Sequence, residues 1–355
     1  MVIDAKITGI TYKPFLCSDL PLFKFDDLDQ ALNENSSFLL QTDENIVAVS
    51  TWVSPKRTRS YPYARVYNTL KHSGKKLTII PFVKDEGKDG DRDFIQWDTI
   101  ALMSLLGVNV IIAYYGVAVK NKNYKNKITN QCFDSEFVGS KIQDLLSYQS
   151  DALHWNIEQI NNISFAAELS KHFYKEISIK TGVELHSDEG INKRVSLIKN
   201  SKNDFMQLSR DNAKAAQQRE INTIQPKEYV EEGIKAKINI TNYLGGTYYF
   251  TCDEAKIEND CVLIIEGKHT KEKKLPSLDD IKDGIVKMIL YSNFKTVKIN
   301  KNNYTAIPVL KLTSSNTKTE NIDAKDDKTI DLLLQEAKAN KFRVELPQGC
   351  KKCSA

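Results

Sequence analysis

The chain lacks the features that mark secreted, disulfide-rich or membrane-spanning proteins. Its 355 residues include only six cysteines, which are scattered along the chain. We therefore expect a reduced compartment, the cytoplasm. The longest apolar stretch, residues 101–115, is short and interrupted by polar residues, so we expect no contact with a membrane. No charged segment followed by an apolar core opens the chain, and no signal peptide is expected.

The chain also lacks a large net charge and several common sequence motifs. The net charge is only +4 and the pI is near 8.5, which permits a nucleic-acid partner without arguing for one. No Gly-x-x-x-x-Gly-Lys-Ser/Thr loop is present, so ATP-driven chemistry has no support. His154, His172 and His186 match no zinc signature and are interpreted as surface or packing residues. The composition is that of an ordinary globular protein with two or three domains.

The most informative stretch covers residues 247–270, where two β-rich runs flank a polar turn. Residues 247–251 are aromatic and β-branched, and residues 261–265 are continuously apolar. Asp253 closes the first run, and Glu266 and Lys268 follow the second. A hairpin would bring these three side chains together at one end. Two carboxylates and an amine in that position make a plausible metal site for cleaving phosphodiesters.

This arrangement resembles the PD-(D/E)xK nuclease superfamily, best known from type II restriction endonucleases. The resemblance covers roughly the last third of the chain, and Cys252 stands where the family usually has proline. It implies that Asp253 and Glu266 bind Mg²⁺. It also implies that Lys268 positions or deprotonates the attacking water, or stabilises charge on the phosphate. Asp253, Glu266 and Lys268 are therefore the expected catalytic residues.

An inert strand end is the alternative interpretation of the motif, because Glu-x-Lys triplets recur in this lysine-rich chain. They occur at residues 86–88, 254–256, 272–274 and 336–338. Such triplets are usually solvated faces. Only Glu266-Gly267-Lys268 follows an apolar strand with an Asp-bearing strand just upstream, and this context favours the metal site.

The rest of the chain predicts an α/β protein with a helical insertion. Strand patterns at 46–52, 75–83 and 108–115, with a helix at 94–106, predict a βαβ-like N-terminal part over 1–133. Residues 134–225 carry helical patterns and are interpreted as a linker or subdomain. Residues 226–355 would form the nuclease core, opening with a helix at 227–244 and continuing with a helix from 276 and a strand at 305–312. The helix from 276 would have an apolar face of Ile281, Ile285, Met288 and Ile289 and a polar face with Lys282 and Lys287. The resemblance implies a mixed sheet flanked by helices, the restriction-endonuclease-like core.

Two basic segments are candidate DNA contacts. Basic and aromatic residues alternate in 54–67, where two prolines favour an extended path. Arginine can form paired hydrogen bonds with phosphates or guanine, tyrosine can stack, and lysine attracts the phosphate backbone. The alternative is a solvated basic loop with its tyrosines packed on the protein. The candidates are Lys56, Arg57, Arg59, Tyr61, Tyr63 and Arg65, with Lys271 and Lys273 after the metal site.

Three further features stay open. The acidic loop Asp85–Asp93 could ligate a hard cation, or it could supply helix caps and solvated charge. Cys350 and Cys353 form a lone Cys-x-x-Cys, for which we favour no role. Glu231 and Glu232 could add an acid to the metal site, but they are more readily interpreted as solvated.

The expected function is a Mg²⁺-dependent type II restriction endonuclease. It would cleave both strands of double-stranded DNA at a short site and act as a homodimer, by analogy with other enzymes that cut symmetric sites. Two alternatives remain. One is a structure-specific or repair nuclease with the same site, and the other is a non-cleaving DNA-binding protein with a degenerate core.

Overall fold

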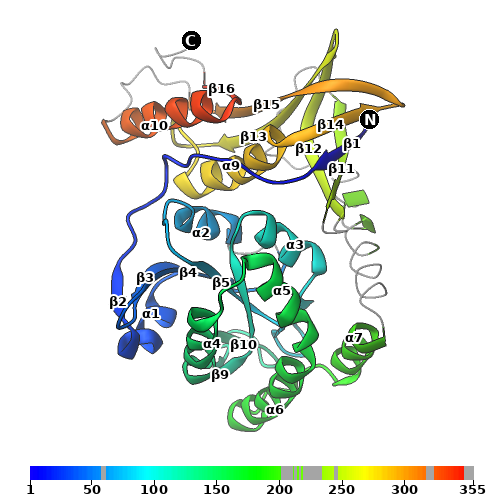
Figure 1. Ribbon diagram of the computed structural model, residues 1–355. Helices are drawn as coiled ribbons and strands as arrows, with labels where there is room; N and C mark the ends of the chain where they lie inside the picture. The colour runs from blue at the N-terminus through cyan, green and yellow to red at the C-terminus, as the bar shows by residue number, and fades with distance from the viewer. Residues whose placement is uncertain are drawn as a thin grey trace. The chain divides into compact units, whose positions relative to one another are not determined.

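The computed structural model describes residues 1–56, 61–200, 234–243, 247–316 and 324–347, together with residues 211, 214, 215, 217 and 218. For residues 197–200 only the backbone is described. The chain forms two compact units (Figure 1). The terminal unit comprises Met1–Ser18 and Arg210–Ala355, and the central unit comprises Asp19–Ser209.

The central unit is built on a five-stranded sheet in the order β2-β3-β4-β5-β8. Strands β4, β5 and β8 are parallel neighbours, whereas β3 is antiparallel to β4. Every residue of β8 is buried, which explains the continuous apolar run in its sequence. The strands are β2 (Leu22–Lys24), β3 (Ser37–Gln41), β4 (Ile46–Thr51), β5 (Lys76–Pro81) and β8 (Asn109–Ala113).

Helices and two hairpins complete this unit. A single core joins α1, α4 and α5 to the sheet through residues such as Ala31, Ile142 and Trp155. The predicted βαβ arrangement is confirmed by β5, α3 and β8, and Gly107 ends the turn after α3 with a φ of +68°. The remaining elements are η1 (Phe25–Asp27), α1 (Leu28–Glu34), α2 (Pro62–Thr69), β6 (Val83–Asp85), β7 (Arg92–Phe94), α3 (Trp97–Leu105), β9 (Tyr115–Lys120), β10 (Ile128–Phe133), α4 (Ser135–Ser147), α5 (Ala152–Asn161), α6 (Ile163–Thr181) and α7 (Glu189–Asn200).

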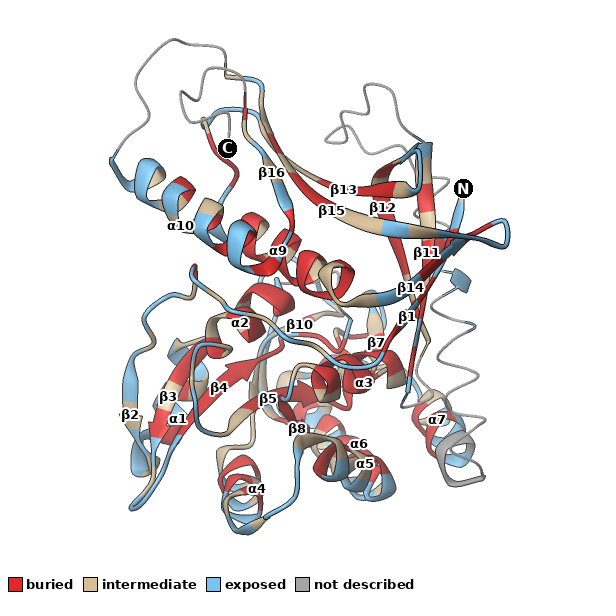
Figure 2. Cartoon of the chain, turned by 45° about the horizontal axis from the view of Figure 1, so that its top comes forward, coloured by how far each residue is buried: buried red, intermediate tan, exposed pale blue. Residues whose placement is uncertain are grey.

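The terminal unit contains a seven-stranded sheet in the order β13-β12-β11-β1-β14-β15-β16, together with the helices α9 and α10. A further pairing of β13 with β15 closes the first six strands into a ring, with β16 outside it. Figure 2 shows buried residues along β13, β15 and α9. The elements are β1 (Val2–Ile7), β11 (Ile234–Asn242), β12 (Thr247–Glu258), β13 (Cys261–Thr270), α9 (Leu278–Ser292), β14 (Phe294–Ile299), β15 (Asn302–Ser314), α10 (Ala324–Asn340) and β16 (Arg343–Glu345).

This closed ring differs from the restriction-endonuclease-like core that was expected. The general α/β class, with sheets flanked by helices, is confirmed, but the sheet is not an open one. The reason lies in two long strands that each change partner along their length. β12 pairs with β11 over 247–255 and with β13 over 254–258. β15 pairs with β14 over 302–304 and with β13 over 305–314. Such staggered pairing allows a sheet to curl until its edges meet.

The helix predicted over 227–244 is wrong wherever this segment is described. Residues 234–242 form β11, which lies between β1 and β12. Its buried side chains Ala236, Ile238 and Ile240 alternate with more exposed ones, which is the period of a strand. Residues 227–233 and 244–246 lie outside the described residues.

Lys282 was predicted on the polar face of α9, but it is only 1% exposed. Its Nζ donates a hydrogen bond of 2.6 Å to Ser18 Oγ, and burial lowers its pKa. Glu336 on α10 is fully buried and accepts hydrogen bonds from Tyr12 Oη at 2.7 Å and Phe15 N at 2.8 Å. The N-terminal segment is thus held to α9 and to α10.

Candidate functional site

The predicted catalytic residues lie on the β12–β13 hairpin. The ladder between these antiparallel strands runs from Glu258 opposite Cys261 to Glu254 opposite Ile265. Asp253 and Glu266 are therefore the next residues beyond the end of the ladder. On its other edge β12 has a bulge, because two of its residues, 253 and 254, face one residue of β11. A bulge bends a strand and changes the direction of its side chains, which is common near active sites.

Asp253 reaches across the hairpin to the middle of the Glu-x-Lys triplet. Its Oδ2 accepts a hydrogen bond of 2.7 Å from Gly267 N. A Cβ atom on Gly267 would lie 3.3 Å from the same oxygen, so a side chain here would crowd the carboxylate. The structure thus brings Asp253 beside the backbone that joins Glu266 to Lys268.

Glu266 and Lys268 are two residues apart on β13 and therefore project from the same face of the strand. The Nζ of Lys268 lies 3.3 Å from Glu266 Oε1. Two residues of α9 extend this contact. Lys287 Nζ donates to Glu266 Oε1 at 2.7 Å, and Lys268 donates to Asp283 Oδ2 at 2.8 Å. The result is a chain of alternating charges, which we call the charge network, formed by Lys287, Glu266, Lys268 and Asp283.

Helix α9 can approach the sheet this closely because it carries a glycine at the contact. A Cβ on Gly284 would lie 2.7 Å from Leu310 Cδ1 and 3.2 Å from Lys268 Cε. Asp283 and Lys287 are four residues apart and share one side of the helix. The predicted apolar face of α9 is confirmed, since Ile281, Ile285, Met288 and Ile289 are all buried. The same packing that buries this face also sets the charge network against β13.

The network affects the pKa of Lys268. Burial opposes the positive charge of Lys268, but the carboxylates of Glu266 and Asp283 outweigh this effect and raise its pKa above the ordinary value. Burial, followed by the nearby charges of Glu266 and Asp253, raises the pKa of Cys252 to about 12. Cys252 therefore stays a neutral thiol beside the carboxylates.

Sequence reasoning missed Asp283 and Lys287 as site residues. Lys287 was assigned only to the polar face of its helix, and Asp283 was not singled out. The available signal was an opposite-charge pair at i and i+4 within the first helix after the hairpin. This signal is weak, because such pairs commonly lie on solvated faces.

The hairpin carries two carboxylates of the kind that hard divalent cations prefer as ligands. Asp253 and Glu266 supply carboxylate oxygens, and Glu266 Oε2 is buried without a hydrogen-bond partner among the described residues. Mg²⁺ is typically bound by one or two carboxylates, with water and substrate phosphates completing its shell. Among the described residues, no group of three or more His, Cys, Asp or Glu side chains is arranged to hold a metal. Any Mg²⁺ here would therefore depend on ligands from water or substrate.

Lys271 and Lys273, predicted to contact DNA, lie in the loop after β13 and are exposed. This loop is held against the end of β15, since Ser314 Oγ donates to Lys273 O at 2.6 Å and Ser315 N donates to Thr270 O at 3.0 Å. The two lysines are thus exposed in the loop that follows the strand of Glu266, and their role in DNA binding stays a prediction.

The two prolines in segment 54–67 predicted an extended path, but part of the segment is helical. Pro62 occupies the first turn of α2, a position that proline favours. Tyr61 before it is 49% exposed. Tyr63 is 5% exposed, and its ring packs edge-on against Trp52 with centroids 6.0 Å apart.

The basic residues of this segment have varied surroundings. Arg65 directs its Nη1 to Thr51 O at 2.8 Å, and Lys56 lies 3.7 Å from Asp93 Oδ1 with its side chain 48% exposed. Arg57 and Arg59 lie outside the described residues. The role of all these residues in DNA binding stays a prediction.

Two carboxylates of the acidic loop are buried and held by protein groups. Asp85 Oδ1 accepts from Gly87 N at 2.9 Å and lies 2.8 Å from His186 Nδ1, and Asp85 Oδ2 lies 3.4 Å from Arg92 Nε. Asp93 Oδ2 accepts from Ser54 Oγ at 2.9 Å. These contacts favour a structural role in the β6–β7 hairpin. Cys350, Cys353, Glu231 and Glu232 lie outside the described residues.

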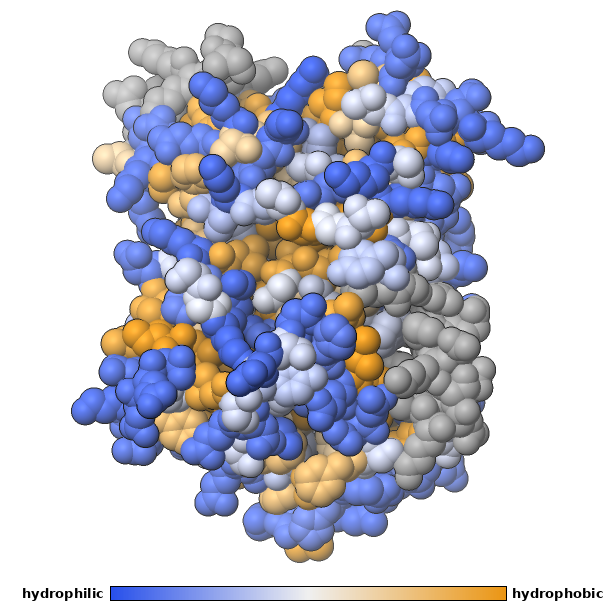
Figure 3. All heavy atoms as spheres, in the orientation of Figure 1, coloured by the Kyte–Doolittle hydropathy of each residue, from blue (hydrophilic) through white to orange (hydrophobic). Residues whose placement is uncertain are grey.

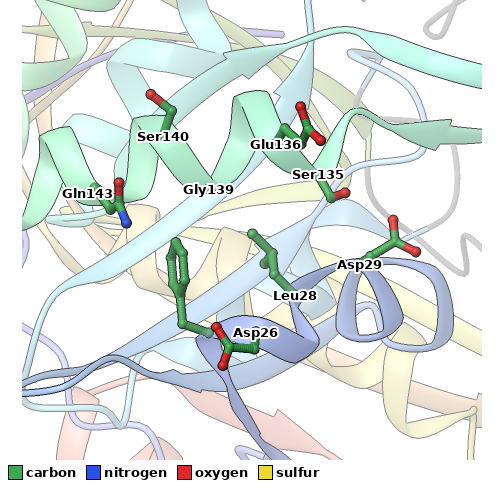
Figure 4. Close-up of a pocket in the computed structure, with 9 residues that line it drawn as sticks. Asp26, Leu28, Asp29, Ser135, Glu136, Gly139, Ser140 and Gln143 are labelled. Atoms are coloured by element: carbon green, nitrogen blue, oxygen red, sulfur yellow. The ribbon is translucent and has the colours of Figure 1, made fainter.

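The central unit has a shallow acidic pocket of about 320 Å³ between η1–α1 and α4 (Figure 4). A Cβ on Gly139 would lie 3.3 Å from both Leu28 Cδ2 and Phe25 Cζ, so glycine lets these helices approach. None of the predicted site residues that the structure describes lines the pocket. The lining residues are Phe25, Asp26, Leu28, Asp29, Ser135, Glu136, Gly139, Ser140 and Gln143.

Comparison of the chain with protein-family models, curated proteins and solved structures finds no match. Over the part of the chain that the structure describes, no helix has both the length and the apolar character required to cross a bilayer. Figure 3 shows hydrophilic residues spread over the visible face, with hydrophobic residues between them.

Proposed function

We propose that this chain is a Mg²⁺-dependent type II restriction endonuclease of the PD-(D/E)xK type that cleaves double-stranded DNA at a short site. The observation that carries the proposal is the hydrogen bond from Gly267 N to Asp253 Oδ2. It joins the acid of one strand to the Glu266-Gly267-Lys268 triplet of the next. The proposal also rests on the buried Oε2 of Glu266, which has no hydrogen-bond partner in the part of the chain that the structure describes.

In this mechanism Asp253 and Glu266 would hold the Mg²⁺. When bound, this ion supplies stabilisation of the charge that develops on the scissile phosphate and lowers the pKa of a bound water. Lys268 is held between Glu266 and Asp283, so its ammonium group has a defined position. A positioned cation can stabilise negative charge on the phosphate or orient the attacking water. Asp283 acts on the reaction through Lys268 and is a positioning residue.

The remaining parts of the proposal concern partners and location. Double-stranded DNA would be attracted by Lys271 and Lys273, which are exposed just after β13. A homodimer would match a symmetric site with one active site for each strand. The scattered cysteines favour the reducing cytoplasm as the place of action.

The proposal is tested by incubating the protein with plasmid DNA and Mg²⁺ and sequencing the ends of the products. Discrete fragments whose ends share one short sequence are expected. EDTA should prevent their formation, and the variant Glu266→Gln should not produce them. Fragments whose ends share no sequence would contradict site-specific restriction.

The alternatives predict different products. A structure-specific or repair nuclease would cut at branches or lesions regardless of sequence. A non-cleaving DNA-binding protein would bind DNA in EDTA and yield no Mg²⁺-dependent products. The contact of Lys287 with Glu266 Oε1 is the observation that favours this last candidate, because a lysine there neutralises a carboxylate that the metal requires.

A further inference from the structure

The β9–β10 hairpin of the central unit gathers positive charge at its tip. Residues 99–133 contain no Asp or Glu, and their only charged side chains are Lys120, Lys122, Lys125 and Lys127. Strand β9 ends at Lys120 and β10 begins at Ile128, so the four lysines lie at the end of β9 and in the turn that follows it. The fold thus places the whole charge of this long segment in one short turn.

This charge is open to solvent. Lys120, Lys122 and Lys125 are exposed, and Lys127 is half-buried. In the part of the chain that the structure describes, none of the four lysines forms an ion pair with a carboxylate. Their ammonium groups can therefore bind an anionic partner without first breaking such a pair.

Two carboxylates near the base of the hairpin have cationic partners of their own. The β6–β7 hairpin contacts this base, since Ile128 N donates to Glu86 O at 3.0 Å. Glu86 Oε1 lies 3.1 Å from Lys84 Nζ. Asp85 Oδ2 lies 3.4 Å from Arg92 Nε. The acidic loop thus pairs with its own cations and leaves the lysines of the tip with their charge.

Hydrogen bonds within the tip shape the backbone that carries the lysines. Asn121 Oδ1 accepts from Asn123 N at 2.8 Å and from Tyr124 N at 3.2 Å. Asn121 N donates to Lys127 O at 2.8 Å. Lys127 Nζ lies 5.0 Å from the centroid of the Tyr124 ring, a distance at which a cation is attracted to an aromatic face. A turn that is already ordered loses less conformational freedom when it binds.

We infer that residues 120–127, the tip of the β9–β10 hairpin, bind the phosphate backbone of double-stranded DNA without reading its sequence. Clustered lysines complement closely spaced phosphates, and contacts with phosphates position a protein on DNA without specifying bases. The inference rests on the proposed function for the identity of the partner. It adds a DNA contact outside the segment 54–67 and outside Lys271 and Lys273.

The test measures binding of the full chain to a labelled random-sequence duplex in EDTA, by fluorescence anisotropy over a series of NaCl concentrations. The hairpin variant combines Lys120→Ser, Lys122→Ser and Lys125→Ser, which removes the three exposed charges. We expect its Kd at low salt to rise at least about tenfold. The slope of log Kd against log salt concentration should fall by about 2.7, because each phosphate contact contributes about 0.9.

A second triple variant, with Lys24→Ser, Lys71→Ser and Lys193→Ser, is the matched control. These three lysines are also exposed in the central unit, but they lie apart in sequence, in β2, after α2 and in α7. The net charge changes by the same amount. Its Kd should stay within about twofold of the wild-type value, because salt screens charges that are distant from the bound phosphates.

Three results would overturn the inference. They are a hairpin variant with the wild-type Kd and slope, an equal loss of affinity in both triple variants, and a wild type that does not bind the duplex. If the hairpin variant does not fold, Lys122→Ser alone decides, with an expected fall in slope of about 0.9.

Binding in EDTA separates this inference from the proposed function. If the wild type cuts no DNA and the hairpin variant still loses affinity as expected, the proposed nuclease is wrong and the hairpin contact stands. If the hairpin variant keeps wild-type affinity and slope while the wild type cuts at a short site, the hairpin contact is wrong and the nuclease stands.

Discussion

At the scale of single residues, the burial of the Glu266 carboxylate explains why the charge network is needed. Its side chain is 2% exposed, and an isolated buried carboxylate is strongly unfavourable. Lys268 and Lys287 offset this cost, and no described residue forms a hydrogen bond with Oε2. A buried oxygen without a hydrogen bond lowers the stability of the folded protein compared with one that accepts a hydrogen bond. Such an atom is a plausible ligand for a cation.

Removing the ammonium group of Lys268 should stop cleavage. We expect Lys268→Ala to reduce the Mg²⁺-dependent cleavage rate at least about 100-fold, because a positioned cation or acid–base group contributes on this scale. DNA affinity should change little, since Lys268 is largely enclosed by Glu266 and Asp283. Gel-based cleavage rates and fluorescence anisotropy with labelled DNA measure the two effects.

Lys271→Ala is the comparison for that variant. This exposed lysine should contribute to DNA affinity in a salt-dependent manner and leave the cleavage rate at saturating DNA unchanged. Full cleavage by Lys268→Ala would move the chemistry away from this hairpin.

Glu336 carries a structural role that can be tested separately. It accepts hydrogen bonds from Tyr12 Oη, Phe15 N and Leu16 N. Glu336→Ala should lower the free energy of unfolding by about 3 kcal/mol or more, because it leaves buried donors unpaired. Urea unfolding measures the change. Glu345→Ala, at an exposed position, should alter stability by less than about 0.5 kcal/mol.

At the scale of elements, the site depends on how α9 lies against β13 and β15. The hairpin was predictable because its two strands have strong local signals, an aromatic run and an apolar run. Helix α9 was predictable from its apolar periodicity. The contribution of α9 to the site could not be predicted, because only the packing of the helix against the sheet brings Asp283 to Lys268. Strand β11 was missed because its branched residues were assigned a helical period although they alternate.

The close approach of α9 should be sensitive to one methyl group. Gly284→Ala improves helix propensity by about 1 kcal/mol, but its methyl group would lie 2.7 Å from Leu310 Cδ1 and 3.2 Å from Lys268 Cε. We expect the crowding to dominate and to lower stability by about 1–2 kcal/mol. Cleavage should fall more than the loss of folded protein explains, because Lys268 is displaced.

Thermal unfolding and cleavage rates of Gly284→Ala measure these two effects. Gly9→Ala is a control in the same unit, since nothing lies within 4 Å of a Cβ there. A Gly284→Ala protein with unchanged stability and activity would show that the helix does not need this close contact.

At the scale of the whole molecule, distant segments build the terminal unit. β1 pairs with β11 and with β14, so the first residues of the chain lie between strands more than 200 residues later. The ring closes only when β13 pairs with β15. Pairings of this kind leave no local signal in sequence. This explains why the α/β class could be predicted and the closed ring could not.

A symmetric DNA site predicts a symmetric assembly. Sedimentation of the protein with a short duplex that contains its site should give a protein mass of twice 40.4 kDa. A single copy on the duplex that cuts both strands would contradict the homodimer. The duplex is chosen once the plasmid products reveal the sequence.

The central claim is that Asp253 and Glu266 act together as the carboxylates of a Mg²⁺-dependent nuclease. The most direct measurement compares cleavage of supercoiled plasmid by the wild type and Asp253→Asn at equal DNA occupancy over a series of Mg²⁺ concentrations. The account predicts cleavage that requires Mg²⁺ in the wild type and a loss of at least about 100-fold in Asp253→Asn, whose amide is a poorer ligand. Equal rates for the two proteins, or no cleavage by the wild type at any Mg²⁺ concentration, would contradict it.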